Sequence, residues 1–330
     1  MQTLHSPAQA AEWLRQHVTG VLCTDSRAIQ KGDGFIAWPG MATDGRAYVA
    51  SAFEQGATAC LVEAEDCSQW HSAWQAASDK VPTQVASYLG LKADTGWIAD
   101  AYYEQPSQAL KVLAVTGTNG KTSSAWWLVH ALNAMQTNPE GTALAPRCAL
   151  VGTLGVGLPP DLVSTGMTTP DPVLLQAQFR KFVAAGISHC AIEASSIGIA
   201  EQRLAGTRIQ LALLTNFTQD HLDYHGSMAA YWQAKQALFA WPELEVAVIN
   251  VDDAQGAKLA ADLSNQALSS KRSQAIDIWT CSSRGQDARL QARHLTRNLT
   301  GLAFDVIEGS ESVHLQTSLW AITTSTTCSA

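Results

Sequence analysis

Residues 112–122 read Val-Leu-Ala-Val-Thr-Gly-Thr-Asn-Gly-Lys-Thr, an apolar run that passes directly into a loop containing two glycines. This order predicts a buried strand, a phosphate-binding loop and a helix that begins near Ser123, because glycines let backbone N–H groups approach phosphate oxygens. Lys121 would direct its charge at the β- and γ-phosphates, and Thr122 would offer its hydroxyl to Mg²⁺. The loop is shorter than G-x-x-x-x-G-K-[ST], since Val115 stands where the first glycine would be. An ordinary strand-to-helix turn is the alternative, but the order of the parts predicts ATP binding.

Length and composition limit the class of protein. A chain of 330 residues is long enough for about two domains. Its net charge of −8 and its scattered lysines and arginines argue against a nucleic-acid surface. The seven cysteines form no C-x-x-C pair, which predicts reduced, mostly buried thiols and neither a disulfide framework nor a zinc site. No signal-peptide pattern or membrane-length apolar run is present, so we expect a cytoplasmic protein with no membrane insertion.

The first part of the chain has the pattern of a small α/β module. Helices are predicted near Ala8–His17 and Tyr48–Gln55, and strands at Gly34–Trp38 and Ala59–Val62. Its polar loops at 24–27 and 40–46 are either solvated turns or ligand contacts. A helical stretch is predicted near Val81–Tyr103. We therefore place a domain boundary near residue 105, with domains over 1–105 and 106–330.

After the phosphate loop, apolar strand patterns alternate with helical ones, which predicts a mainly parallel sheet with helices on both faces. Ligands of such sheets bind beyond the carboxyl ends of the strands. Polar clusters fall at three of these ends, and they begin at Glu193, Thr215 and Asn250. The predicted elements are Cys148–Val151, Val173–Ala185, His189–Ile192, Ile209–Thr215, Met228–Phe239 and Val246–Asn250.

Each candidate side chain in these clusters has more than one interpretation. Glu193 follows an apolar strand, so it is either a Mg²⁺ ligand or a buried paired charge. His221 and His225 fit a transition-metal site or a helix cap, and beside ATP we favour His221 near a second Mg²⁺ and leave His225 as structural. Lys235 shares its predicted helix with apolar residues and is consistent with a lysine stem lying across them.

Taken together, the clusters resemble the Mur ligase family, and most closely its UDP-N-acetylmuramoyl-tripeptide synthetase branch. The resemblance covers about residues 20 to 319 and rests on seven ordered motifs. These are Asp25-Ser26-Arg27, Asp44-Gly45-Arg46, Thr116-Gly-Thr-Asn-Gly-Lys-Thr122, Thr168-Thr169-Pro170, Glu193-x-Ser-Ser196, Thr215-Asn216 with Asp220-His-Leu-Asp-Tyr-His225, and Tyr231-Trp-Gln-Ala-Lys235.

The resemblance implies a role for each matching position. Lys121, Lys235 and His221 would be catalytic, with Lys235 carbamylated so that it becomes an anionic oxygen ligand of Mg²⁺. Departures from the family are Met167 and Glu201, where relatives carry Asn and Gln, and Ile197, where a His often follows the two serines. The implied ATP contacts are Gly117, Thr118, Asn119, Gly120, Lys121, Thr122, Ser123 and Asn250. The implied metal ligands are Thr122, Glu193, His221 and Lys235. The implied substrate contacts are Thr24, Ser26, Met41, Ala42, Thr43, Thr168, Thr169, Ser195, Glu201 and Arg203.

The implied reaction is ATP-dependent amide-bond formation in peptidoglycan synthesis. The γ-phosphoryl group would pass to a carboxylate of UDP-MurNAc-L-Ala-D-Glu, and the amine of a free amino acid, meso-diaminopimelate or L-lysine, would displace phosphate from the acyl phosphate. We expect a monomer whose cofactors are ATP and Mg²⁺. The alternatives are another ligase of the superfamily, such as a folylpolyglutamate synthetase or a different peptidoglycan step, and a non-catalytic nucleotide-binding remnant.

The end of the chain departs from the family. Residues 320–330 become rich in Thr and Ser where relatives carry a Gly-x-Phe/Tyr-Asn-x-x-Asn-x-Leu segment and then an amino-acid-binding domain. Trp320 has the single codon TGG, so a shift to its final G makes the next codon GGC, a glycine, and the shifted frame permits the family segment. We therefore expect a frameshift, with the last helix of the central domain and the C-terminal domain absent and the product unstable or inactive. The alternative is an ordinary polar tail.

Overall fold

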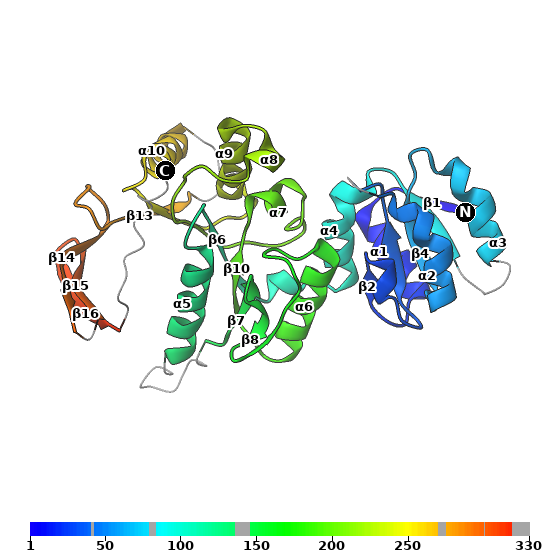
Figure 1. Ribbon diagram of the computed structural model, residues 1–330, viewed down its shortest axis with the longest axis horizontal. Helices are drawn as coiled ribbons and strands as arrows, with labels where there is room; N and C mark the ends of the chain where they lie inside the picture. Colours follow the sequence, from blue (N-terminus) through cyan, green and yellow to red (C-terminus); the bar gives the residue numbers. More distant parts are fainter. Residues whose placement is uncertain (41–42, 79–83, 136–145, 270–274, 300, 319–330) are drawn as a thin grey trace. The chain divides into compact units, whose positions relative to one another are not determined.

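The computed structural model describes residues 1–40, 43–78, 84–135, 146–269, 275–299 and 301–318. The chain forms two compact units. Unit 1 comprises Met1–Leu110, Thr169–Ser188 and Ala200–Thr207, and unit 2 comprises Lys111–Thr168, His189–Ile199 and Arg208–Ala330 (Figure 1). Two segments beyond residue 110 therefore pack with the first unit, and the predicted domains over 1–105 and 106–330 stay a prediction. Met41, Ala42 and the segment 320–330 lie outside the described residues.

Unit 1 is built on a parallel sheet. Its described strands run in the order β1-β5-β4-β3-β2, and every neighbouring pair is parallel. The strands are β1 (Gln2–Leu4), β2 (Leu22–Cys23), β3 (Gly34–Ala37), β4 (Ala59–Glu63) and β5 (Gln84–Tyr88). The helices are α1 (Pro7–His17), α2 (Val49–Gln55), α3 (His71–Ser78), α4 (Leu91–Tyr102) and α6 (Pro172–Ala184), with short 3₁₀ helices η1 (Ser26–Ala28), η2 (Gly45–Tyr48), η3 (Cys67–Trp70) and η4 (Pro106–Gln108).

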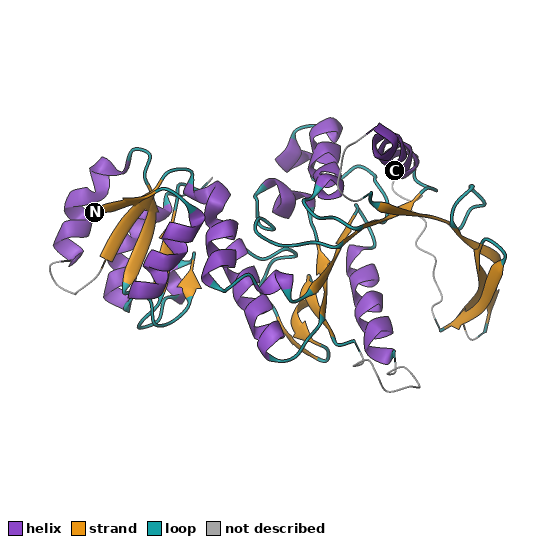
Figure 2. Ribbon diagram, turned by 180° about the vertical axis from the view of Figure 1, so that it is seen from behind, coloured by secondary structure: helices purple, strands orange, loops and turns teal. Residues whose placement is uncertain are grey.

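Both faces of this sheet are covered by helices (Figure 2). Alternate residues of a strand point to opposite faces, so Ile36 and Leu61 join one apolar cluster with residues of α1 and α4. Phe35 and Cys60 join the other cluster with residues of α2 and α3. Two covered faces explain the near-continuous apolar character of β3 and β4.

One sequence prediction in this unit is wrong in its first half. The stretch expected to be helical near Val81–Tyr103 contains the strand β5, and α4 begins only at Leu91. β5 pairs with β4 on one side and β1 on the other, so these sheet hydrogen bonds override the local helical pattern. Gly90, at φ 75°, separates the two elements in a left-handed conformation that a glycine adopts without strain. The helices and strands predicted before residue 65 are confirmed to within about two residues.

Unit 2 has a larger, mainly parallel sheet. Among the described residues its strands run β16-β15-β14-β13-β12-β11-β6-β10-β7-β8-β9, with β14 to β16 and β7 to β9 antiparallel and the pairs between parallel. Its strands are β6 (Lys111–Thr116), β7 (Cys148–Gly152), β8 (Gly155–Leu158), β9 (Asp161–Val163), β10 (His189–Glu193), β11 (Leu211–Leu214), β12 (Val246–Asn250), β13 (Asp277–Ser282), β14 (Leu290–Asn298), β15 (Gly301–Glu308) and β16 (Glu311–Thr317). Its helices are α5 (Lys121–Ala134), α7 (Ser196–Ala200), α8 (Leu222–His225), α9 (Met228–Gln236), η5 (Ala237–Ala240) and α10 (Ala254–Ser269).

The predicted α/β class with a mainly parallel second sheet is confirmed. Strand β6 lies between β10 and β11, and Val115 packs with Ala125 and Val129 of α5 in a buried cluster. The antiparallel strands at the two edges of the sheet were not predicted. In the part of the chain that the structure describes, we find no helix both long and apolar enough to cross a lipid bilayer.

Candidate functional site

The predicted phosphate loop lies at the carboxyl end of β6. Strand β6 ends at Thr116, and α5 begins at Lys121, two residues before the predicted start. Gly117 has φ 139° and Gly120 has φ 83°, conformations that favour glycine. A Cβ atom at Gly117 would collide with the Thr215 hydroxyl. The glycines therefore allow the close packing and the backbone geometry that a phosphate cradle needs.

The loop after β11, which contains Thr215 and Asn216, forms several hydrogen bonds with the phosphate loop. The Thr118 amide donates to the Asn216 carbonyl (2.9 Å), and the Asn119 amide donates to Asn216 Oδ1 (2.9 Å). Thr215 Oγ1 donates to the Asn119 carbonyl (2.6 Å). Asn250 joins this arrangement through Nδ2, which donates to the Thr215 carbonyl (2.7 Å). The family resemblance implies that Asn250 contacts the nucleotide. In the structure its side chain hydrogen-bonds to Thr215, and Thr215 in turn hydrogen-bonds to the phosphate loop.

Two lysines converge on one carbonyl of the phosphate loop. Lys121 Nζ donates to the carbonyls of Gly117 (3.0 Å) and Thr118 (2.9 Å). Lys235 Nζ, on α9, donates to the same Gly117 carbonyl (2.8 Å) and lies 4.6 Å from the ring centroid of Tyr231. Lys235 is 1% exposed. The pKa of Lys235 is lowered to about 7, chiefly by burial and then by repulsion from Lys121, while Asp220 opposes both effects. Burial also lowers the pKa of Lys121.

Glu193 is the buried carboxylate beside this loop. It ends β10 with an exposed fraction of 0%. Its Oε2 accepts from the Thr122 hydroxyl (2.8 Å), and its Oε1 accepts from the Thr153 amide (2.8 Å). A Cβ atom at Gly152 would collide with the carboxylate, so the glycine that ends β7 makes room for it. The Thr122–Glu193 contact brings together two of the side chains predicted to hold Mg²⁺.

The two histidines have different surroundings. His221 is half exposed, and its Nε2 lies 3.6 Å from Asp220 Oδ2. His225 Nε2 is 3.0 Å from Ser196 Oγ, and its ring lies 5.2 Å from that of Tyr231. Burial, together with His221 and Lys235, lowers the pKa of His225, which favours the neutral imidazole. These contacts agree with the structural role expected for His225.

The donor set can be tested against the expected Mg²⁺. Mg²⁺ prefers hard oxygen ligands and retains several waters, so one or two carboxylates suffice. Thr122 and Glu193 supply a hydroxyl and a carboxylate in contact with each other. The described residues contain no group of three or more His, Cys, Asp or Glu side chains that could hold a metal ion. Thr122 and Glu193 therefore fit a magnesium ion that retains several waters.

In unit 1, three predicted substrate contacts line one pocket. Thr24, Ser26 and Thr43 border a cavity of about 610 Å³. At its rim, the Arg27 guanidinium pairs with Asp25 (2.7 Å). The Asp44 carboxylate caps η2 by accepting from the Arg46 amide. A volume of this size falls in the range of small-molecule sites, about 300–1,000 Å³.

A second polar group in unit 1 is centred on Asp171. This carboxylate caps α6, and the Thr24 hydroxyl hydrogen-bonds to it. Arg203 interacts electrostatically with Asp171 and donates to the Thr169 carbonyl (3.0 Å). Burial raises the pKa of Asp171. The structure thus brings Thr24, Thr169 and Arg203 together through a residue that the sequence analysis did not select.

The remaining predicted site residues are divided between the two units. Glu201, in unit 1, pairs with Lys92 (2.6 Å). Thr168 and Ser195 belong to unit 2, where Thr168 Oγ1 is 3.1 Å from Thr153 Oγ1 and Ser195 Oγ accepts from the Gly198 amide (3.0 Å). Ser123 is exposed in the first turn of α5.

Thr153, like Asp171, is a functional candidate that the sequence analysis did not select. Its amide and its hydroxyl both contact Glu193, the hydroxyl at 3.3 Å, and the hydroxyl also reaches Thr168. Thr153 directly follows β7, a predicted parallel strand, so its position at the carboxyl end of that strand was the available signal.

Comparisons with known proteins give consistent results. The Mur ligase middle domain profile matches residues 115–321, and the profile of the Mur ligase family, catalytic domain, matches residues 17–94. Relatives include the UDP-N-acetylmuramoyl-L-alanyl-D-glutamate–2,6-diaminopimelate ligases of Acidovorax sp. (strain JS42) and Janthinobacterium sp. (strain Marseille). The Acidovorax ligase is 57% identical over 96% of this chain and 60% of its own length. The Janthinobacterium ligase is 41% identical over 94% and 59%.

A solved structure of a protein with the same ligase name superposes with a TM-score of 0.70 at 28% identity, covering 91% of this chain and 55% of that one. MurF from Acinetobacter baumannii gives a TM-score of 0.61 at 17% identity, covering 95% and 60%, and so shares the fold. This chain therefore spans about 60% of the length of the relatives that it matches.

Proposed function

This chain belongs to the Mur ligase family, and we propose that it carries the ATP site and the nucleotide-sugar site of a ligase acting in peptidoglycan synthesis. The proposed reaction joins diaminopimelate to UDP-MurNAc-L-Ala-D-Glu. Two relatives that are 57% and 41% identical carry 2,6-diaminopimelate in their names, which favours this amino acid over L-lysine.

The observation that carries the proposal is the convergence of Lys121 and Lys235 on the Gly117 carbonyl. The ammonium groups of buried Lys235 and partly buried Lys121 meet at one carbonyl and repel each other. A triphosphate relieves this repulsion, because its oxygens accept from Lys121 and from the backbone N–H groups of the first turn of α5. An ordinary strand-to-helix turn gives no reason to place two ammonium groups at one carbonyl.

The residues of the chain then have defined roles in the reaction. A substrate carboxylate oxygen attacks the γ-phosphorus, the bond to the β-phosphate oxygen breaks, and ADP leaves. The incoming amine attacks the carbonyl carbon of the acyl phosphate, and phosphate leaves as the amide forms. Lys121 stabilises charge on the transferring phosphoryl group, while the Thr215–Asn216 loop holds the cradle in position.

We propose that Lys235 is carbamylated. The neutral amine nitrogen bonds to the carbon of CO₂ and releases one proton, so that a buried cation becomes an anion. Burial beside Lys121 favours this conversion, because it replaces repulsion between the two lysines with attraction. A pKa of about 7 leaves much of the amine neutral, and therefore reactive, near neutral pH.

Thr122, Glu193 and a carbamylated Lys235, with His221 nearby, are the residues proposed to hold Mg²⁺. A bound magnesium ion would neutralise charge on the phosphates. The Thr122 hydroxyl and the Thr153 amide hold the Glu193 carboxylate in a fixed orientation.

The nucleotide sugar is assigned to the 610 Å³ cavity of unit 1. Thr24, Ser26 and Thr43 offer hydroxyl groups there, and the predicted contacts Thr169 and Arg203 connect to Thr24 through Asp171. We also propose a monomer in the cytoplasm. The six described cysteines are free thiols, which is typical of a reducing compartment.

The test measures binding before turnover. Calorimetry of ATP with Mg²⁺ should detect binding to the chain, and Lys121→Ala should weaken it by about tenfold or more, since a charge-assisted contact is worth roughly 1.5–3 kcal/mol. Lys111→Ala, at an exposed position in β6, is the matched control. Phosphate release should then require both UDP-MurNAc-L-Ala-D-Glu and diaminopimelate, with L-lysine as the comparison. Equal ATP affinity in the Lys121→Ala variant and the wild type refutes the assigned phosphate site.

A further inference from the structure

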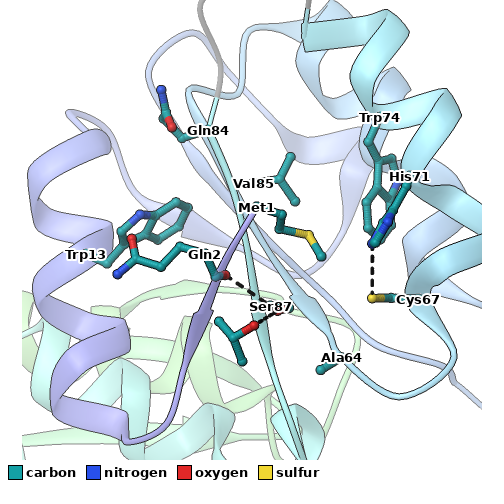
Figure 3. Close-up of a pocket in the computed structure, with 11 residues that line it drawn as sticks. Met1, Gln2, Trp13, Ala64, Cys67, His71, Trp74, Gln84, Val85 and Ser87 are labelled. Atoms are coloured by element: carbon teal, nitrogen blue, oxygen red, sulfur yellow. Dashed lines mark hydrogen bonds between the residues drawn. The ribbon is translucent and has the colours of Figure 1, made fainter.

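A pocket in unit 1, separate from the 610 Å³ cavity, contains a paired thiol and imidazole. It has a volume of about 680 Å³. Cys67 Sγ lies 3.4 Å from His71 Nε2, and both side chains line the pocket. Figure 3 shows the thiol and the ring facing each other, with Trp74 beside His71 and Met1 nearby in the same pocket. None of these residues belongs to the ATP or nucleotide-sugar sites described above.

Two groups beside Cys67 favour its reaction with a disulfide. The imidazole of His71 can take the thiol proton and remain beside the sulfur as a cation. The guanidinium of Arg46 is buried and close enough to Cys67 for the two groups to interact electrostatically.

The other described cysteines lie in surroundings that oppose ionisation. Burial, followed by the carboxylate of Asp33, raises the pKa of Cys23 to about 12. Burial, followed by Asp252, raises the pKa of Cys281. Burial raises the pKa of the thiols of Cys60, Cys148 and Cys190 as well.

The pocket itself indicates the size and chemistry of the reaction partner. Its volume is that of a small-molecule site. Gln2 and Gln84 supply amide groups at its wall, and Trp13 supplies an aromatic surface. These groups suit a small thiol that carries peptide bonds. The side-chain amides of Gln2 and Gln84 can form hydrogen bonds with the peptide groups of such a molecule while its sulfur reaches Cys67.

We propose that Cys67 is a modification site that undergoes thiol–disulfide exchange with a low-molecular-weight disulfide of a peptide thiol, and that the adduct lies in this pocket. His71 takes the proton of Cys67, and the Cys67 sulfur attacks one sulfur of the disulfide. A new S–S bond forms, the original S–S bond breaks, and the second sulfur leaves as a thiolate. The small disulfide is the oxidant.

The experiment uses the full chain with Cys328→Ser, because Cys328 lies outside the described residues. Oxidised glutathione is added at pH 7, and peptide mass spectrometry follows the rate of modification at each cysteine. Cys67 should react about tenfold faster than Cys23 or Cys281, because His71 can accept its proton, while a nearby carboxylate opposes proton loss from each of the other two thiols. Hydroxyethyl disulfide, which lacks amides, should show a smaller preference for Cys67.

Two variants test the role of the pair. His71→Ala should slow modification of Cys67 by about tenfold at pH 7 and change the pH dependence of that rate, because the imidazole that accepts the thiol proton is lost. Cys67→Ser should abolish the fast phase, while circular dichroism and the thermal midpoint report whether each variant is folded. Modification of Cys23 ahead of Cys67, or an unchanged rate and pH profile in folded His71→Ala, overturns the proposal. Because no nucleotide or ligase substrate is added, the result is independent of the proposed ligase activity.

Discussion

Replacing Lys235 with methionine should stabilise the fold while removing a residue proposed to be essential for ligation. The ammonium group is buried at 1% exposure beside a second lysine. Its pKa falls from 10.5 to about 7. Each tenfold change in proton affinity is worth about 1.4 kcal/mol, so near pH 7 the folded site disfavours the charged form by roughly 4 kcal/mol relative to the unfolded chain.

Methionine has a similar length and removes this cost, but it also removes favourable contacts. The hydrogen bond from Nζ to the Gly117 carbonyl contributes about 1 kcal/mol, and the contact with the Tyr231 ring contributes about 0.5–2 kcal/mol. The expected net gain in the free energy of unfolding near pH 7 is therefore about 1–3 kcal/mol.

The gain should depend on pH in a definite direction. Between pH 7 and 10.5 the unfolded chain binds a proton at Lys235 that the folded chain does not, so the wild type becomes more stable as pH rises. The advantage of the variant should therefore be largest below pH 7 and should shrink as pH rises. Near pH 10.5 the charge penalty is gone and only the lost contacts of Lys235 remain, so the variant should be the less stable of the two there.

Urea unfolding in buffer free of CO₂ and Mg²⁺, read by hydrogen exchange of peptides from β6 and α9, measures the stability of unit 2. Lys258→Met, at an exposed position of α10, is the control and should change stability by less than about 0.5 kcal/mol. A Lys235→Met variant that is less stable than the wild type at pH 7, or a difference that does not shrink with rising pH, refutes the reasoning.

Three further substitutions test neighbouring parts of the structure. Gly152→Ala should cost about 1–3 kcal/mol in a urea titration and weaken ATP binding, because the new methyl group displaces the Glu193 carboxylate. Thr153→Val, compared with Thr153→Ser, should cost about 1 kcal/mol through the lost hydroxyl contacts; equal stability of the two variants would contradict this. Asp100→Asn should stabilise unit 1 at pH 8 by up to about 3 kcal/mol and have little effect at pH 3.5, as thermal unfolding at both pH values can show. Burial raises the pKa of Asp100 to about 6, and one of its oxygens has no hydrogen-bond partner among the described residues. The folded state therefore becomes less stable as pH rises from 3.8 through 6.

The sequence was sufficient wherever chemistry is encoded by neighbouring residues. Strand β6, the turn with two glycines and helix α5 follow from residues 112–122, because the signals for all three stand in one short stretch. The apolar strands of both units were also recognisable, since a strand covered on both faces is apolar throughout. The family motifs by themselves indicate Glu193 and Lys235 as candidate site residues, because each stands at a fixed place in a short motif.

Local pattern was insufficient where pairing decides the structure. The local sequence of β5 predicts a helix, but hydrogen bonds to β1 and β4 on its two sides make it a strand. The antiparallel strands β14 to β16 likewise depend on pairing with their neighbours at the edge of the sheet. Strand pairing joins residues far apart in the sequence, and no local periodicity records it.

Only the tertiary structure decided how the site residues meet. Lys235 and Gly117 are 118 residues apart, yet Nζ donates to the carbonyl at 2.8 Å. Thr153 contacts Glu193 across 40 positions, and Asp171 joins Thr24 to Arg203. The sequence specifies which groups are charged or polar, but the burial and proximity that lower the pKa of Lys235 arise only when the parallel strands bring their carboxyl ends to one edge of the sheet.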